Sequence, residues 1–186
     1  TGVQTCALPI SDAAGNAVEF TCLVPTENEA RKNMAAFIQQ DLAKLGVKMN
    51  VVPLETPALN ERWQKTFDYD AVLFGLTQTD TEPSSYANFL LSSGSYHQWQ
   101  PKQKQPATDW EKRVDELFTQ QSVERDTQKR IAAFSEIQAI FREEMPVIPI
   151  IARHVVTAAS SKIGNYNPSP IIPYSLWNVD DLFLKP

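Results

Sequence analysis

The stretch AVEFTCLVPTENEARKNMAAFIQQDLAKLGVKMNVVPL, residues 17–54, decides the fold class. Apolar side chains recur at every second position in residues 17–25, which is typical of a strand. Thr26 and Glu29 have the spacing of a capping box, and apolar side chains then recur at helical spacing. A second alternating run, residues 47–51, follows. The stretch therefore predicts a βαβ unit with parallel strands and a right-handed crossover.

A second helix and a third strand extend this pattern. Thr56 can cap a helix whose first position is Pro57 and which runs to about Phe67. Residues 69–77, YDAVLFGLT, are apolar nearly throughout, as is typical of a strand covered on both faces of a sheet. The alternation of strands and helices predicts the α/β class.

The next part of the chain is predicted to be irregular at first and then helical. Residues 78–105 are rich in Ser, Thr, Gln, Pro and Gly, with a short helix expected near residues 84–91. Thr108 and Glu111 have capping-box spacing and open one helix, and Asp126 starts a longer one. One face of the longer helix is expected to carry its apolar side chains: Ile131, Phe134, Ile137, Phe141 and Met145.

The end of the chain is predicted to be extended. Pro146 ends the longer helix, and residues 147–159 form a β-like run. The remaining residues form a tail that needs a surface to pack on, because it is interrupted by prolines and carries the large apolar side chain of Trp177.

The composition excludes several classes of protein. The chain has 186 residues, 42% of them hydrophobic and 21% charged, which is enough for a globular domain with a real core. The formal net charge is −5, and Lys and Arg are scattered, so we expect no nucleic acid and no anionic membrane as a partner. No apolar run approaches the roughly 20 residues that a membrane-spanning helix needs.

The first residues have an unusual sequence. Residues 1–10, TGVQTCALPI, resemble the translation of a sequencing-library adapter and are interpreted as an artefact, so that the natural protein would continue upstream of Ser11. The alternative is an ordinary flexible N-terminal segment. Under the first interpretation Cys22 is the one natural cysteine, and its place in an apolar alternation predicts a small core residue.

Local motifs indicate no catalytic, metal or cofactor site. His97 and His154 are far apart in sequence and have no carboxylate or cysteine at metal-ligand spacing, so each is expected to be a polar contact. No nucleophile or nucleotide-binding motif occurs. Asp80 and Glu82 are neighbouring loop acids, and without further information they indicate a solvated turn before Pro83.

The chain from about Gly15 to its end resembles the family 5 solute-binding proteins of ABC importers, the peptide/nickel/dipeptide-binding type. The resemblance rests on the order and spacing of several segments: DLAKLGVKMNVV, YDAVLFGLTQTDTEP, YANFLLSSGSYHQW, PATDWEKRVDELF, RIAAFSEIQAIFREEMPVIPII and LWNVDDL. It implies a periplasmic-binding-protein-like fold of type II, cluster C. Residues 11–145 would form most of the lower α/β lobe, and residues 146–186 would be the C-terminal segment that returns to the upper lobe.

The resemblance also implies a function. The protein would be a monomer that binds an oligopeptide or a similar small solute without changing it, as the extracytoplasmic component of an ABC importer. Its partners would be the permease and ATPase subunits, and its location the periplasm or the outer face of the cytoplasmic membrane. The alternatives are a sensor or chaperone partner on the same fold, or an α/β hydrolase fragment. Nickel and haem ligands also occur in the family, but two isolated histidines argue little for either.

The resemblance places the ligand beyond the carboxyl end of the third strand, where open α/β sheets bind ligands. Backbone groups of Gly75, Leu76 and Thr77 would pair with an extended peptide. In peptide-binding members an aspartate four residues before a proline holds the ligand's α-amino group. That position is Thr79 here, so Asp80, one residue closer to Pro83, is the candidate.

Three more side chains are candidates for ligand contact. Arg62 lies where relatives present a basic residue, and it could hold a carboxylate bidentately; the alternative is a surface helix arginine. Tyr96 and Trp99 could form an aromatic flank of a broad pocket; the alternative is a loop pinned to the lobe by its aromatic residues.

Overall fold

The structure is a computed structural model that describes residues 10–11, 14–77, 82–152 and 154–186. The chain divides into two compact units, and the boundary along the sequence lies between Leu76 and Thr77. We call them the sheet unit and the helical unit and describe each by itself. The predicted lobe boundary near Met145 stays a prediction.

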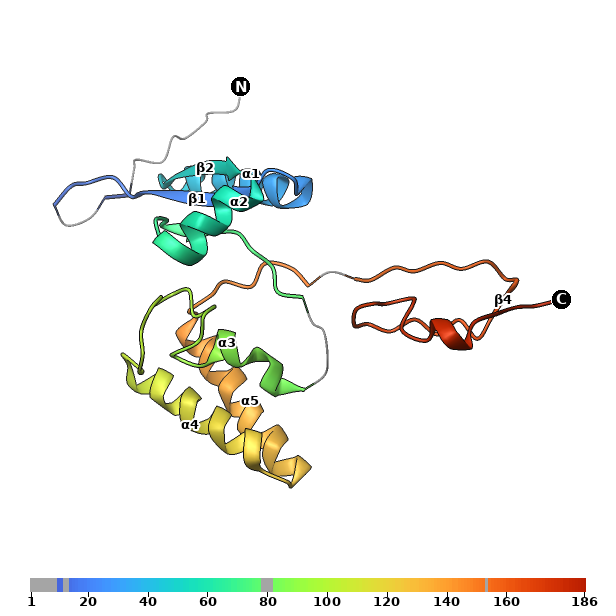
Figure 1. Ribbon diagram of the computed structural model, residues 1–186. Coiled ribbons are helices and arrows are strands. Elements are labelled where there is room, and N and C mark those ends of the chain that lie inside the picture. Colours follow the sequence, from blue (N-terminus) through green and yellow to red (C-terminus); the bar gives the residue numbers. More distant parts are fainter. Residues whose placement is uncertain (1–9, 12–13, 78–81, 153) are drawn as a thin grey trace. The chain divides into compact units, whose positions relative to one another are not determined.

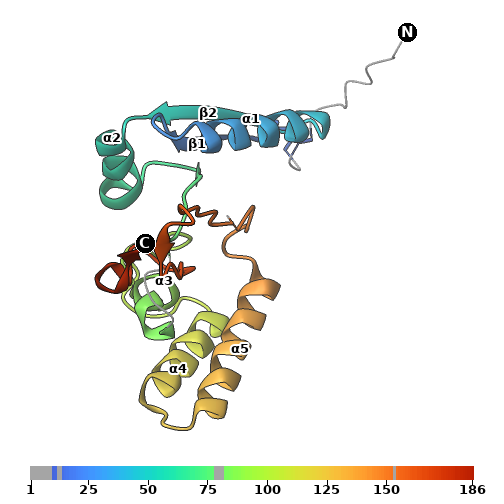
Figure 2. The same ribbon diagram turned by 90° about the vertical axis from the view of Figure 1, so that its right-hand side faces the viewer.

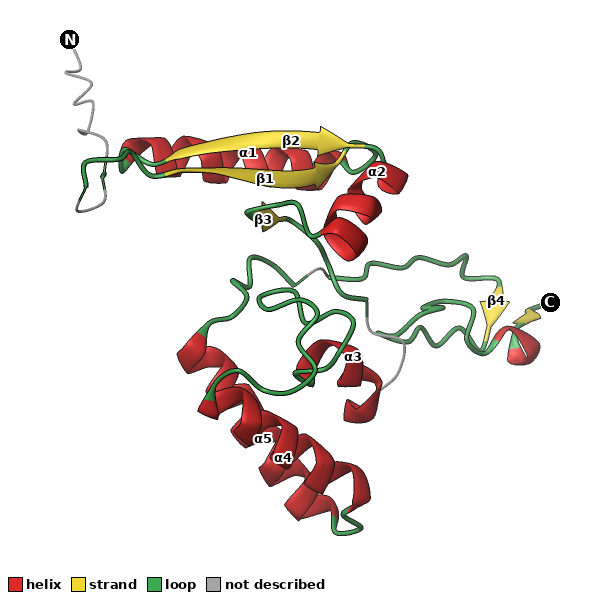
Figure 3. Cartoon of the chain, turned by 60° about the vertical axis from the view of Figure 1, so that its left-hand side comes forward, coloured by secondary structure: helices red, strands yellow, loops and turns green. Residues whose placement is uncertain are grey.

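The sheet unit contains the predicted βαβ arrangement. Its strands β1 (Glu19–Pro25), β2 (Lys48–Leu54) and β3 (Ala71–Val72) form a sheet of order β2-β1-β3 in which both pairs are parallel. Helix α1 (Glu29–Lys44) lies along β1 and β2, as Figure 3 shows. Helix α2 (Thr56–Asn60) continues as the π-helix η1 (Glu61–Thr66). The expected parallel strands and the helix between them are confirmed.

The core of the sheet unit explains why β1 is the central strand. Cys22, Leu23 and Val24 are consecutive and all buried, so both faces of β1 are covered. Met49 from β2, Ala35 from α1 and Leu59 from α2 are buried as well. Cys22 is a free, buried core residue, as predicted.

Two predicted helix caps in the sheet unit are wrong by a residue or two. The N-cap of α1 is Asn28, whose Oδ1 accepts from the N–H of Arg31 at 3.0 Å, and not Thr26. The N–H of Thr26 instead donates to the carbonyl of Leu54 at 2.9 Å, which keeps Thr26 at the end of the strands. The N-cap of α2 is Glu55 rather than Thr56.

The third strand is shorter than expected. Residues 69–77 were predicted to be strand, but the ladder covers Ala71–Val72 and one further hydrogen bond, from the N–H of Leu73 to the carbonyl of Leu23. Pro25 ends β1 and has no N–H with which to extend a ladder. The residues after Leu73 are therefore left without a neighbouring strand.

The helical unit begins with two short helices and contains a helical hairpin. The short 3-10 helix η2 (Pro83–Tyr86) leads into α3 (Ala87–Leu90), which confirms the expected short helix. Helices α4 (Asp109–Val123) and α5 (Thr127–Glu144) lie side by side in Figures 1 and 2. Both predicted caps are confirmed, since Thr108 and Glu111 form a reciprocal capping box and Asp126 accepts from two N–H groups of the first turn of α5. The hairpin buries Leu90, Val114, Leu117, Phe118, Ala133 and Ile137.

The predicted apolar face of α5 is correct only in its middle. Ile137 is buried, and Phe134 and Phe141 pack against the core. Ile131 is 53% exposed and Met145 is 47% exposed. Met145 is not helical, because the last helical residue is Glu144 and Met145 has a left-handed φ of 46°.

The β-like run predicted for residues 147–159 is wrong: none of its described residues is in a strand. The segment is extended and largely exposed, with Ile148 78% and Val156 90% exposed. An alternating apolar pattern forms a strand only beside a partner strand, and the described part of the chain offers none here. Further along, β4 (Ile163–Gly164) pairs antiparallel with β5 (Phe183–Leu184), and the 3-10 helix η3 (Val179–Asp181) lies just before β5.

Among the described residues, no helix is both long enough and apolar enough to cross a membrane.

Candidate functional site

The carboxyl edge of the sheet is the candidate site. Because the strands are parallel, β1, β2 and β3 end on the same side, and the first turns of α1 and α2 start there. Gly75, Leu76 and Thr77 follow β3 and are all exposed, Leu76 by 50%. Their backbone groups have no hydrogen-bond partner within the described residues. An extended ligand could therefore pair with them.

Arg31 also lies at this edge, and the sequence reasoning missed it. A Cβ atom built on Gly75 would stand 2.8 Å from Nη2 of Arg31, so the guanidinium lies directly against the backbone of Gly75. The signal in the sequence was the position of Arg31 in the first turn after β1. That position alone does not distinguish it from other helix-surface cations.

Arg62 is paired with Asp68, which lies close to it in the sequence. Its Nη2 lies 3.1 Å from Oδ2 of Asp68, and its Nε donates to the carbonyl of Asp68 at 2.9 Å. These contacts hold the turn that follows η1, in which Phe67 has a left-handed φ of 57°. The carboxylate-binding role of Arg62 stays a prediction.

Asp80 and Thr79 lie outside the described residues. Glu82, the other loop acid, accepts from the N–H of Ser84 at the start of η2 and forms an ion pair with Arg130 of α5. Glu82 is thus part of the helical unit rather than a simple solvated turn.

Trp99 is held inside the helical unit. Its ring lies 5.6 Å from those of Phe89 and Phe141 and 6.2 Å from that of Trp110, measured between ring centroids. These contacts fit the alternative in which aromatic residues pin the loop. Tyr96 stays 37% exposed, and its N–H donates to the carbonyl of Asn88. Contact of either residue with a ligand remains a prediction.

Glu111 does more than close the capping box. Its Oε1 accepts from Nε2 of His97 at 2.8 Å, from Nε1 of Trp99 at 3.2 Å and from Nε2 of Gln103 at 3.1 Å. Its Oε2 accepts from the N–H groups of Ala107 and Thr108. Glu111 and His97 are each 2% exposed, which confirms His97 as a polar contact. This buried cluster ties the irregular loop before α4 to the helix.

The electrostatics of Glu111 follow from this cluster. Burial raises the pKa of its carboxyl, but the hydrogen bonds that it accepts, the largest contribution coming from His97, lower the pKa further, to about 2 from an ordinary 4.5. No group of three or more potential metal ligands occurs in the part of the chain that the structure describes. The cluster is therefore best described as a structural one.

Stability should fall in acid because of Glu111. A carboxyl whose folded pKa is lowered contributes stability that is present above its unfolded pKa and is lost as the pH falls from about 4.5 toward 2. The shift corresponds to about 3 kcal/mol. Urea unfolding of the complete protein at pH 6, 4.5 and 3 should show this loss, and Glu111→Gln, which removes the titrating group, should show less of it. Parallel losses in parent and variant would contradict the prediction.

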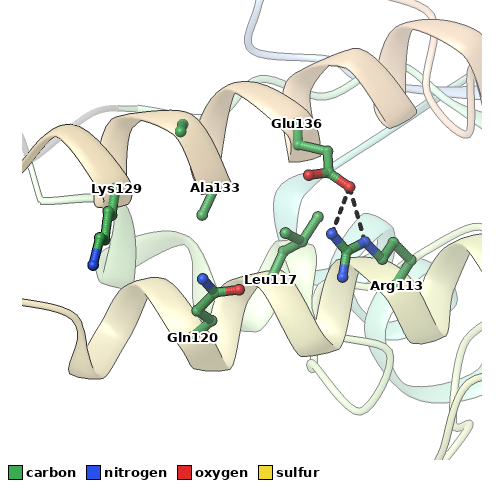
Figure 4. A pocket seen from close by; sticks show the side chains of 7 residues that line it. Arg113, Leu117, Gln120, Lys129, Ala133 and Glu136 are labelled. Atoms are coloured by element: carbon green, nitrogen blue, oxygen red, sulfur yellow. Dashed lines mark hydrogen bonds and ion pairs between the residues drawn. The ribbon is translucent and has the colours of Figure 1, made fainter.

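A pocket lies between α4 and α5 (Figure 4). Its lining consists of Arg113, Leu117, Gln120, Lys129, Ala132, Ala133 and Glu136. Nη2 of Arg113 lies 2.8 Å from Oε1 of Glu136, so an ion pair joins the two helices across it. Both side chains are 47% exposed, and such pairs contribute at most about 1 kcal/mol. This ion pair is a polar contact between the two helices of the hairpin. The candidate site remains the sheet edge.

One protein family matches the part of the chain that contains this site. The family described as "Bacterial extracellular solute-binding proteins, family 5 Middle" matches residues 9–98, which include the sheet, its carboxyl edge and the loop up to His97. The match covers 90 of the 186 residues, and over this part the chain is similar to family 5.

Curated proteins similar to this chain are named for peptide binding or peptide transport. It is 26% identical over 148 residues to di/tripeptide-binding protein 2 of Pseudomonas aeruginosa, covering 79% of this chain and 26% of the relative. It is 24% identical over 144 residues to the peptide transport periplasmic protein SapA of Haemophilus influenzae, covering 77% of this chain and 25% of the relative. The chain thus spans about a quarter of the length of these curated relatives.

A solved structure supports the fold of the chain. The oligopeptide-binding protein AppA of Bacillus subtilis, in complex with a nonapeptide, matches 100% of this chain and 35% of its own, with a TM-score of 0.66 and 19% identity. At this identity the likeness shows the fold alone. The expected α/β binding-protein fold, present here in part, is confirmed.

Proposed function

We propose that the complete protein carrying this chain binds a short peptide or a similar small solute and delivers it to an ABC importer. The observation that carries the proposal is the exposed backbone of residues 75–77 at the carboxyl edge of a parallel sheet, which has no hydrogen-bond partner among the residues that the structure describes. Main-chain pairing gives affinity for an extended peptide with little dependence on its side chains. The names of the relatives, a di/tripeptide-binding and a peptide transport protein, support a peptide.

The proposed arrangement has two lobes that close on the solute. Residues 11–145 would belong to the lower lobe and residues 146–186 to the upper lobe. Asp80 would hold the amino group of the ligand, and Arg62, Tyr96 and Trp99 are further candidate contacts. Closure by a hinge motion would be stabilised by contacts made only in the closed state.

The proposed setting lies outside the cytoplasmic membrane. The protein would act as a monomer in the periplasm or on the outer face of that membrane, with permease and ATPase subunits as its partners. The name of the SapA relative, a peptide transport periplasmic protein, supports this location. Binding without chemical change is proposed because a carrier must release its solute intact.

The first test is the fate of a bound peptide. The complete protein should form a one-to-one complex with trialanine in native mass spectrometry, and denaturation should release trialanine of unchanged mass. A neutral disaccharide is the control and should bind more weakly. A cleaved or modified peptide would contradict the proposal of a pure binder, and absence of any complex would contradict the peptide as ligand.

A further inference from the structure

We propose that Arg31 binds a carboxylate of the ligand at the carboxyl edge of the sheet. The sequence suggested this role for Arg62. This inference rests on the proposed function, because it names the chemical group that this edge takes from a peptide-like solute. It also gives the site a cation that its family resemblance did not suggest.

The position of Arg31 follows from the connection between β1 and α1. Asn28 caps the helix and accepts from the N–H of Arg31, which fixes this residue in the first turn, at the carboxyl edge. The positive end of the helix dipole lies at the same turn and favours an anion there. The Arg31 side chain is therefore presented at the same edge as Gly75.

Gly75 makes room for the guanidinium. Its φ lies outside the left-handed region, so the backbone conformation does not require glycine. A Cβ would stand 2.8 Å from Nη2 of Arg31, so a side chain at this position would displace the guanidinium from its place beside the backbone. The absent side chain lets the cation lie beside the backbone that is proposed to pair with a peptide.

The guanidinium of Arg31 has no partner within the described residues, although the residue is partly buried. The two acidic residues that are close to Arg31 in the sequence have other partners. Glu29 pairs with Lys32 at 2.5 Å, and Glu27 accepts a hydrogen bond from the N–H of Thr56 at 3.0 Å. A partly dehydrated cation without a counter-charge gains by binding an anion. Arg62 differs, since Asp68 already occupies its Nε and Nη2.

A carboxylate is the anion that best fits this setting. The planar fork of a guanidinium matches the two oxygens of a carboxylate and can bind them through parallel hydrogen bonds. A peptide paired along residues 75–77 would bring either its C-terminus or an acidic side chain close to Arg31. Amidation of a peptide's C-terminus tests the first case directly.

The main experiment is calorimetry on the complete protein with trialanine and trialanine amide. The parent should bind the free acid roughly 10- to 100-fold more tightly than the amide, the ratio expected for a charge-assisted hydrogen bond. Arg31→Gln should remove this preference, and Gly75→Ala, which pushes against the guanidinium without changing the charge, should reduce it. Lys32→Gln is the matched control, since it removes a cation of the same helical turn that is already paired, and it should keep the preference.

The outcomes separate this inference from the proposed function. If trialanine binds but Arg31→Gln keeps the preference, or Arg62→Gln removes it, the assignment to Arg31 is overturned while the binder remains. A second measurement needs no peptide: in protein labelled with ¹⁵N-arginine, the Nε–Hε signal that is missing in Arg31→Gln should shift saturably with acetate and not with acetamide. Absence of that shift overturns the inference even if peptides bind.

Discussion

Replacing Glu111 by alanine should destabilise the helical unit by about 3–5 kcal/mol, because each of several buried donors that loses its acceptor costs about 1–3 kcal/mol. Glu111 is 2% exposed, and its carboxylate accepts hydrogen bonds from His97, Trp99 and Gln103 as well as from backbone N–H groups. The alanine leaves these buried donors without an acceptor and removes half of the capping box. Hydrogen exchange of the complete protein, read over residues 92–123, should report the loss.

The matched control is Glu116→Ala on the same helix. The side chain of Glu116 is 53% exposed and reaches Arg113 at 3.7 Å, so its removal should cost less than about 1 kcal/mol. Equal losses in the two variants would mean that the buried cluster adds nothing beyond an ordinary surface carboxylate.

Ile137→Ala should cost about 2–5 kcal/mol, because it opens a cavity in the packed interface of α4 and α5. Ile137 is 1% exposed and belongs to the core with Leu117 and Phe118. The same substitution at Ile131, which lies on the same helix but is 53% exposed, should change the free energy of unfolding by no more than about 0.5 kcal/mol. Thermal or urea unfolding of the complete protein can compare the two.

A large loss in Ile131→Ala would contradict this comparison. It would mean that another part of the complete protein covers that face of α5. The sequence pattern gave both isoleucines the same role, so the pair also tests how far a helical periodicity defines a core.

The elements that depend on neighbours in sequence were predictable. The three-residue spacing of Thr108 and Glu111 predicted a capping box that the structure contains. Parallel strands around α1 followed from alternation and helical spacing in one continuous stretch. These signals work because each hydrogen bond or apolar contact joins residues a few positions apart.

The features that depend on distant residues were not predictable. Thr26 and Asn28 are both good caps, and a hydrogen bond from Thr26 to Leu54 favours Asn28. Arg31 and Arg62 look alike as helix arginines, and only Asp68 and Gly75 distinguish them in space. In each case the deciding partner has no fixed spacing that a sequence pattern could contain.

The extended segment after Pro146 has a consequence for anyone who prepares this chain by itself. Residues 147–159 are rich in β-branched side chains, and Ile148, Ile151 and Val156 are 78%, 63% and 90% exposed. An exposed, extended, apolar backbone is a template on which another copy can add as a strand. Pro149 interrupts that template early, so aggregation at high concentration should begin in the part of the segment that follows it.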